Sequence, residues 1–201
     1  MIIAIHNTKG GVGSTTLAAH LCALGRDLGW KVDAVSADPT QELRRHLQPL
    51  DIRLLDPESF DREAAADDER DLLVIDVQTA SSPPVSPDVW LVPVSCRLAQ
   101  EHATALTDRL VGEVSWIPMM SYEVTVPAYL EGVEILPSVP YSRAIIKAAS
   151  QQESVWSDTE LALTPGAQAL RESLTQLLSA TMGSRGVFAE EPAKPTTTTS
   201  P

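Results

Sequence analysis

The sequence predicts an α/β fold, with a doubly wound, mostly parallel sheet flanked by helices. Three observations predict it. The apolar run Ile2–Ile5 leads into a glycine-rich segment and then into a helical pattern. Asp71–Asp76 encloses a second apolar run, typical of a strand buried on both faces. Segments of strand and helix character then alternate along most of the chain, which is the order expected of a parallel sheet.

The N-terminal half is expected to alternate strands with two helices. Strands are expected over residues 2–7, 31–36 and 71–76, with an edge strand over 52–55. A helix is expected over 14–28, because its leucines recur at helical spacing and Gly29 follows as a stop. A second helix is expected over 40–47, where Pro39 favours a helix start.

The C-terminal half is expected to continue the alternation. Strands are expected over 89–94, 114–120 and 133–136, and helices over 98–111, 140–150 and 164–182. Residues 183–201 lack periodicity and end in Pro-Thr-Thr-Thr-Thr-Ser-Pro, so we expect a disordered Pro/Thr-rich tail. Residues 1–182 are therefore expected to form one domain.

Composition limits the class of protein. The 201 residues are 43% hydrophobic and 21% charged, a soluble globular profile, and no apolar run is long enough to span a bilayer. Cys22 and Cys96 have no ligand-like partners nearby and are interpreted as reduced core thiols of a cytoplasmic protein. The net charge of −12, from 15 basic and 27 acidic residues, excludes a long basic face. Any DNA binding should be weak and salt-sensitive.

The glycine-rich segment has the form of a phosphate-binding loop. It reads Lys9-Gly10-Gly11-Val12-Gly13-Ser14-Thr15-Thr16. Loop N–H groups and the free N–H groups of the following helix converge on a bound anion. A tight turn without function is the alternative, but the preceding strand, Lys9 and the two threonines favour the phosphate loop. Ser14 stands where the general P-loop has a lysine that contacts the β- and γ-phosphates.

Two carboxylates follow predicted strands at the same edge of the sheet. Asp76 ends the strand over 71–76, and Asp38 follows the strand over 31–36. Ligands of parallel α/β sheets bind at the carboxyl ends of the strands. Asp76 is therefore a candidate Mg²⁺ ligand, with an ordinary strand-end residue as the alternative. Asp38 is a candidate for function, or else an N-cap ahead of Pro39.

These motifs resemble those of the ParA/MinD group of deviant-Walker P-loop ATPases, especially small ParA-like partition proteins. The family loop K-G-G-x-x-K-[ST] matches from Lys9 to Thr15, except at Ser14. The resemblance implies a P-loop NTPase fold in which Lys9 reaches the nucleotide of the partner in an ATP-sandwich homodimer. It implies that the Thr15 hydroxyl ligates Mg²⁺, that Asp38 positions the attacking water or the magnesium shell, and that Asp76 holds Mg²⁺ through water.

The same resemblance extends, less specifically, to the C-terminal region. It implies that Pro137 and Pro140 flank the adenine and that a helix with basic residues follows. Arg143 and Lys147 lie four residues apart, which suits phosphate contacts with DNA, and a solvated surface pair is the alternative.

By resemblance, the function is DNA partition or cargo positioning in the cytoplasm, in association with the nucleoid. The implied cofactors are ATP or ADP and Mg²⁺, and the implied partners are a second copy, a ParB-type adaptor and weakly bound DNA. No membrane role is expected, because the tail lacks a basic amphipathic helix. Ser14, and Ser36 in place of a family aspartate, predict weak or impaired hydrolysis. The alternative is a pseudo-ATPase scaffold that partners a true ParA-type ATPase.

Overall fold

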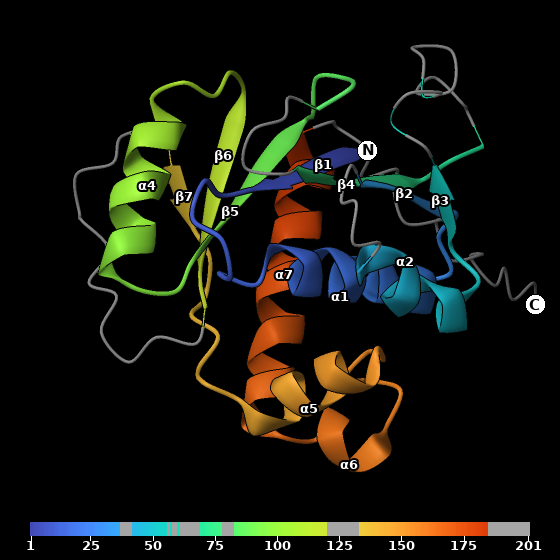
Figure 1. Ribbon diagram of the computed structural model, residues 1–201. Coiled ribbons are helices and arrows are strands. Elements are labelled where there is room, and N and C mark those ends of the chain that lie inside the picture. Colours follow the sequence, from blue (N-terminus) through green and yellow to red (C-terminus); the bar gives the residue numbers. More distant parts are fainter. Residues whose placement is uncertain are drawn as a thin grey trace, which may run out of the picture.

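One parallel sheet organises the molecule (Figure 1). The computed structural model describes residues 1–36, 42–55, 57, 60, 69–77, 83–119 and 133–184. Within these residues the strands are β1 (Ile2–His6), β2 (Val32–Ser36), β3 (Arg53–Leu55), β4 (Leu72–Val77), β5 (Val89–Val94), β6 (Glu113–Pro118) and β7 (Val133–Ile135). Their order is β3-β2-β4-β1-β5-β6-β7, and each neighbouring pair is parallel. All strands therefore end at one edge, here called the carboxyl edge, and begin at the opposite amino edge.

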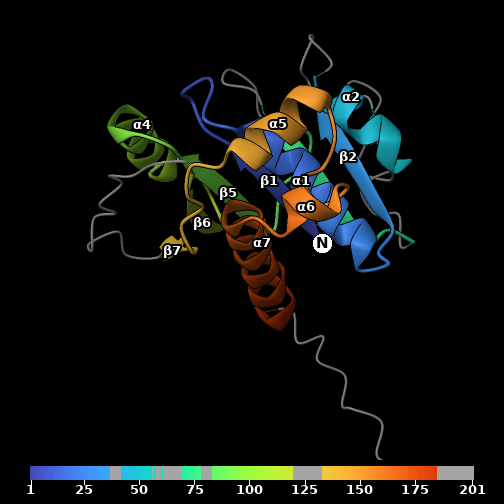
Figure 2. The same cartoon turned by 90° about the horizontal axis from the view of Figure 1, so that it is seen from below.

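Helices cover both faces of the sheet. They are α1 (Ser14–Asp27), α2 (Glu42–Leu47), α4 (Arg97–Thr107), α5 (Arg143–Gln151), α6 (Thr159–Ala162) and α7 (Pro165–Ser184), with a 3₁₀ turn over Gln48–Leu50. Helices α1, α2 and α7 share one hydrophobic cluster with one face of the sheet, and α4 packs on the other face. Helices α5 and α6 lie on the outer side of α1, as Figure 1 and Figure 2 show from two directions. This layering confirms the doubly wound α/β prediction.

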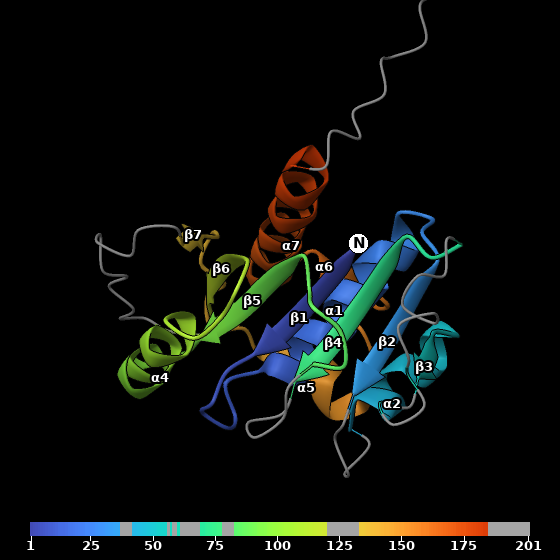
Figure 3. The ribbon, with the colours of Figure 1, turned by 90° about the horizontal axis from the view of Figure 1, so that it is seen from above.

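Strand alternation decides which side chains face α1. In β4, Leu72 and Val74 belong to the cluster on the α1 face, whereas Leu73 and Ile75 belong to the cluster on the α4 face. Because successive side chains of a strand point to opposite faces, Asp76 shares the face of Val74. Figure 3 shows α1 beneath β1 and β4 on that face.

Most predicted elements are confirmed, with shifts at their ends. Strand β4 continues one residue past Asp76, and the helix predicted over 98–111 ends at Thr107. Helix α6 was missed, and α7 extends to Ser184. The predicted tail beyond that residue lies outside the described residues.

The two cysteines lie in different environments. The prediction of two core thiols was wrong for Cys96, which is exposed at the start of α4, whereas Cys22 is buried in α1. Burial, reinforced by the charges of Asp76 and Asp33, raises the pKa of the Cys22 thiol and leaves it unreactive.

Among the helices of the described part, none combines the length and apolar character that crossing a bilayer needs.

Candidate functional site

The glycine-rich loop adopts a conformation that only glycine tolerates well at two positions. Gly11 has φ 74° and Gly13 has φ 96°, both left-handed. Gly13 is also the N-cap of α1, and its carbonyl accepts the first helical hydrogen bond, from Leu17 N–H at 2.9 Å. The N–H groups of Ser14, Thr15 and Thr16 precede that bond and have no acceptor within the helix. This end of α1 is therefore suited to bind an anion.

Space for a ligand exists along the outer side of the loop. A Cβ added at Gly10 or Gly11 would meet no atom within 4 Å. Val12 between them and the helix is buried, and it fixes the loop to the core. The loop is thus anchored on its inner side and open on its outer side.

A hydroxyl and a carboxylate meet at the start of α1. Thr15 Oγ1 donates a hydrogen bond of 2.9 Å to Asp76 Oδ2. Asp76 is only 5% exposed and lies in register with Ile5 of β1 and Ser36 of β2. The sequence predicted both residues as Mg²⁺ ligands, and the structure places them in contact.

Lys9 lies at the other end of the loop. Its backbone N–H donates to Asn7 Oδ1 at 2.8 Å, and its Nζ donates to the Gly10 carbonyl at 2.6 Å. Lys9 is half-buried. The ammonium group is therefore folded onto the loop in this chain, close to where the phosphate loop begins.

The segment with the two predicted adenine-side prolines pairs with Met119, which lies beside Gly13 of the loop. A Cβ at Gly13 would lie 3.4 Å from Met119 Cε. Met119 forms a parallel bridge with Val139, which lies between Pro137 and Pro140. The structure therefore places this segment beside the carboxyl edge, and its role at the adenine stays a prediction.

The basic pair lies elsewhere. Arg143 and Lys147 are exposed on α5, which begins after the N-cap Ser142 and lies on the outer side of α1. They do not join Thr15 and Asp76. Asp38 lies outside the described residues.

A buried histidine behind the loop was not predicted as functional. His20 is fully buried, and its Nε2 accepts a 3.1 Å hydrogen bond from Val155 N–H. Its Nδ1 must then carry the proton that is donated to the Thr16 carbonyl at 2.7 Å. Burial lowers the pKa of His20 to about 4. A neutral imidazole thus connects the first turns of α1 to the segment between α5 and α6, and no local sequence pattern signals this.

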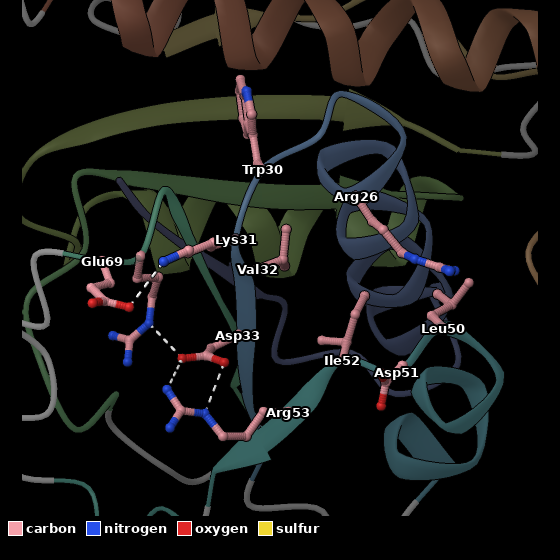
Figure 4. Close-up of a pocket in the computed structure, with 11 residues that line it drawn as sticks. Arg26, Trp30, Lys31, Val32, Asp33, Leu50, Asp51, Ile52, Arg53 and Glu69 are labelled. Atoms are coloured by element: carbon pink, nitrogen blue, oxygen red, sulfur yellow. Dashed lines mark hydrogen bonds and ion pairs between the residues drawn. The ribbon is translucent and has the colours of Figure 1, made fainter.

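The amino edge carries a pocket of about 460 Å³ that contains none of the predicted site residues (Figure 4). Arg53 Nε and Arg70 Nε donate to Asp33 at 3.0 and 2.7 Å, whereas Trp30, which also lines the pocket, points away from this cluster. Burial alone would raise the pKa of Asp33, but these hydrogen bonds outweigh it and lower that pKa. Lys31 pairs with Glu69 at 2.9 Å. This arrangement has the character of a structural ion cluster.

The fold and the loop agree with comparisons to known proteins. Residues 3–84, which span β1, the loop, α1 and β4, match the family model of the CobQ/CobB/MinD/ParA nucleotide binding domain. The sheet and its helices have the P-loop NTPase fold of MinD and ParA proteins. No curated protein sequence matches the chain.

Solved structures extend the likeness over most of the chain. The septum site-determining protein MinD of Pyrococcus horikoshii OT3 with Mg-ADP is 16% identical, with a TM-score of 0.67 over 88% of this chain and 95% of that one. A chain of the MinC:MinD cell division complex of Aquifex aeolicus is 18% identical, with a TM-score of 0.67 over 96% and 98%. A protein of Borrelia burgdorferi B31 described as a plasmid partition protein, bound to AMPPNP, is 13% identical, with a TM-score of 0.65 over 89% and 98%. At these identities the likeness establishes the fold.

Proposed function

We propose that this chain is a MinD/ParA-like nucleotide-binding protein that takes ATP or ADP with Mg²⁺ at the carboxyl edge. The observation that carries the proposal is the contact between Thr15 and Asp76 at the start of α1, directly after a loop with two left-handed glycines. The family model over residues 3–84 supports it. So do the Mg-ADP and AMPPNP bound to proteins of the same fold.

The residues present fit a magnesium nucleotide. The loop and the first N–H groups of α1 would bind the phosphates. The Thr15 hydroxyl proton is directed at Asp76, so the oxygen lone pairs are available to a cation, and Asp76 would hold Mg²⁺ through water. Within the described residues no three His, Cys, Asp or Glu side chains form a ready metal cluster. Phosphate oxygens and water would supply the other ligands, as Mg²⁺ prefers.

Binding is expected to be retained better than catalysis. When bound, Mg²⁺ supplies a Lewis acid that draws charge from the phosphates. Ser14, the first residue of α1, has no positive charge to place against the phosphates. One missing charge-assisted contact costs on the order of 2–4 kcal/mol of transition-state stabilisation, or roughly 30- to 1000-fold in rate. Lys9 and Asp38 are the remaining candidates for catalytic roles.

The cellular role we propose is ATP-dependent dimerisation in DNA partition or cargo positioning, with an adaptor of the ParB type. The plasmid partition protein and the MinC:MinD complex of the same fold support a role with partner proteins. Arg143 and Lys147 on the exposed face of α5 would make any DNA contact. The net charge of −12 keeps such binding weak.

Calorimetry with ATP and Mg²⁺, together with a turnover assay, tests the proposal on the native chain and Ser14→Lys. We expect the native chain to bind ATP and the substitution to raise turnover by about 30- to 1000-fold, because it restores the missing charge. A native chain that binds neither ATP nor ADP, and that lysine does not rescue, would contradict nucleotide binding.

The second candidate is a pseudo-ATPase that binds nucleotide, or none, as a scaffold for a true ATPase. The presence of serine at the first position of α1 favours it. Turnover by the native chain that disappears in Asp38→Ala would exclude this candidate. Nucleotide binding without turnover, both in the native chain and in Ser14→Lys, would support it.

A further inference from the structure

The side chain of Asn7, which precedes the phosphate loop, holds the start of that loop in place. Asn7 follows β1 directly and is 4% exposed. Its Oδ1 accepts the Lys9 N–H at 2.8 Å, and its Nδ2 donates to the Pro93 carbonyl of β5 at 2.7 Å. A longer contact of 3.5 Å reaches the Ala99 carbonyl in the first turn of α4. Asn7 therefore joins β1, the loop, β5 and α4.

The next residue makes a second bond to the same helix. Thr8 Oγ1 and His102 Nδ1 lie 2.8 Å apart, and both residues are half-buried. Figures 1, 2 and 3 all show the loop after β1 running beside α4. The geometry of the loop around Lys9 is thus tied to the position of one helix.

Helix α4 is held to the sheet by few bulky side chains. Its buried residues are Ala99, Ala103 and Leu106. Its outer side carries Arg97, whose side chain is 92% exposed and pairs with Glu101 four residues on. Two alanines provide little apolar area, so a small displacement of α4 costs less than displacement of α1 or β4 would.

We propose that Asn7 and the Thr8–His102 pair are positioning residues that couple the phosphate loop to α4. The coupling rests on the proposed nucleotide site. With α4 in place, Lys9 and the loop amides are held ready for phosphate, and bound nucleotide in turn restrains α4. Coupling between two sites is reciprocal. If bound nucleotide weakens the binding of a partner that displaces α4 by a given factor, that partner weakens nucleotide binding by the same factor.

Isosteric and conservative variants separate this role from a purely structural one. Thr8→Val and His102→Leu each remove the bond, whereas Thr8→Ser keeps the hydroxyl and His102→Asn keeps a polar atom near the Nδ1 position. Thr104→Val is the matched control, because Thr104 Oγ1 donates a 3.0 Å bond to the Gln100 carbonyl within α4. It removes a side-chain bond from the same helix, and that bond reaches neither the loop nor the sheet.

Two measurements on the full chain test the proposal. Titration with ATP and Mg²⁺ should show Thr8→Val and His102→Leu each losing about five- to tenfold in affinity, the worth of one hydrogen bond. The double variant should lose no more than either single variant, since both remove the same bond. Thr8→Ser, His102→Asn and Thr104→Val should stay within about twofold of the native chain.

Hydrogen exchange without nucleotide supplies an independent readout. Amides 9–13 should exchange faster in Thr8→Val and His102→Leu than in the native chain or in Thr104→Val. Native affinity in Thr8→Val, additive losses in the double variant, or equal losses in Thr104→Val would overturn the coupling. If the native chain binds no nucleotide, the proposed function fails. Hydrogen exchange would then be the remaining test of the coupling, and equal exchange rates of amides 9–13 in the native chain and all variants would overturn it.

Discussion

The two edges of the sheet each carry a buried carboxylate, and they use it differently. At the amino edge, Asp33 accepts hydrogen bonds from the guanidinium groups of Arg53 and Arg70. At the carboxyl edge, Asp76 accepts one from the neutral hydroxyl of Thr15, beside the open N-terminus of α1. The first carboxylate is bound to cations that the chain supplies. The second lies where a cation and an anion could be added together.

The pocket and the candidate nucleotide site therefore lie at opposite edges of the sheet. The 460 Å³ pocket lies at the amino edge, beside charges that are already paired with one another. The carboxyl edge has instead the loop with Gly11 and Gly13 in the left-handed conformation and the free amide groups that phosphate binding needs. We therefore expect substitutions at the amino edge to change stability and those at the carboxyl edge to change ligand binding.

The largest effect is expected for Asp33→Asn, which keeps the shape of the side chain and removes its charge. The free energy of unfolding should fall by about 3–5 kcal/mol, because the guanidinium of Arg70, with 6% side-chain exposure, loses its carboxylate. Urea unfolding at neutral pH measures it. Glu101→Gln, which breaks the exposed pair with Arg97, should cost less than about 1 kcal/mol. Equal effects of the two substitutions would contradict the distinction.

The next-largest effect is a loss of stability at low pH, and it depends on His20, a buried residue of α1. The unfolded chain takes up a proton near the ordinary pKa of 6.5, and the folded chain only near about 4. The folded state is therefore progressively destabilised as the pH falls through that window, by about 3 kcal/mol in all. Unfolding of the native chain between pH 7 and pH 4 measures this loss.

The control for that prediction is His20→Gln, which removes the titrating group but leaves His6 and His46, whose pKa values are also lowered by burial. The variant should show a flatter dependence of stability on pH than the native chain. Parallel profiles would mean that His20 is not buried as a neutral imidazole.

The smallest effect on stability comes from a pair of glycines, one at each edge. Gly13→Ala and Gly29→Ala both place a side chain at positive φ, 96° and 80°, and each should cost about 1–2 kcal/mol in thermal unfolding. Only Gly13→Ala should also reduce ATP affinity, because Gly13 ends the phosphate loop and a Cβ there would lie 3.4 Å from Met119 Cε. An equal loss of affinity in both variants would remove the functional distinction between the edges.

The sequence allowed prediction of the parts whose signal is local. Strands β4 and β5 are buried on both faces, so their apolar runs set their bounds to within a residue. The loop was predictable because its glycines, Lys9 and Thr15 are adjacent in the chain. The placement of the loop and Asp76 at one edge followed from the rule that ligands of parallel sheets bind where the strands end, whereas the hydrogen bond of Thr15 to Asp76 was not predicted.

Other parts had no local signal. Helix α6 has four residues and only the N-cap Asp158 to mark it. The predicted helix over 98–111 was too long because Leu110, which fits the helical spacing, packs from the segment after α4. Thr8 and His102 are 94 residues apart, and their contact depends on how α4 is placed against β5. Such contacts come from tertiary packing, which a single sequence does not display.

A calorimetric titration of the full chain with ATP and Mg²⁺ tests the central claim, that the carboxyl edge is a nucleotide site and the amino edge is structural. The native chain should bind, Thr15→Val should lose at least about tenfold in affinity, and Arg53→Ala should stay within about twofold. A native chain that does not bind, or a Thr15→Val variant that binds as well as the native chain, would contradict the claim.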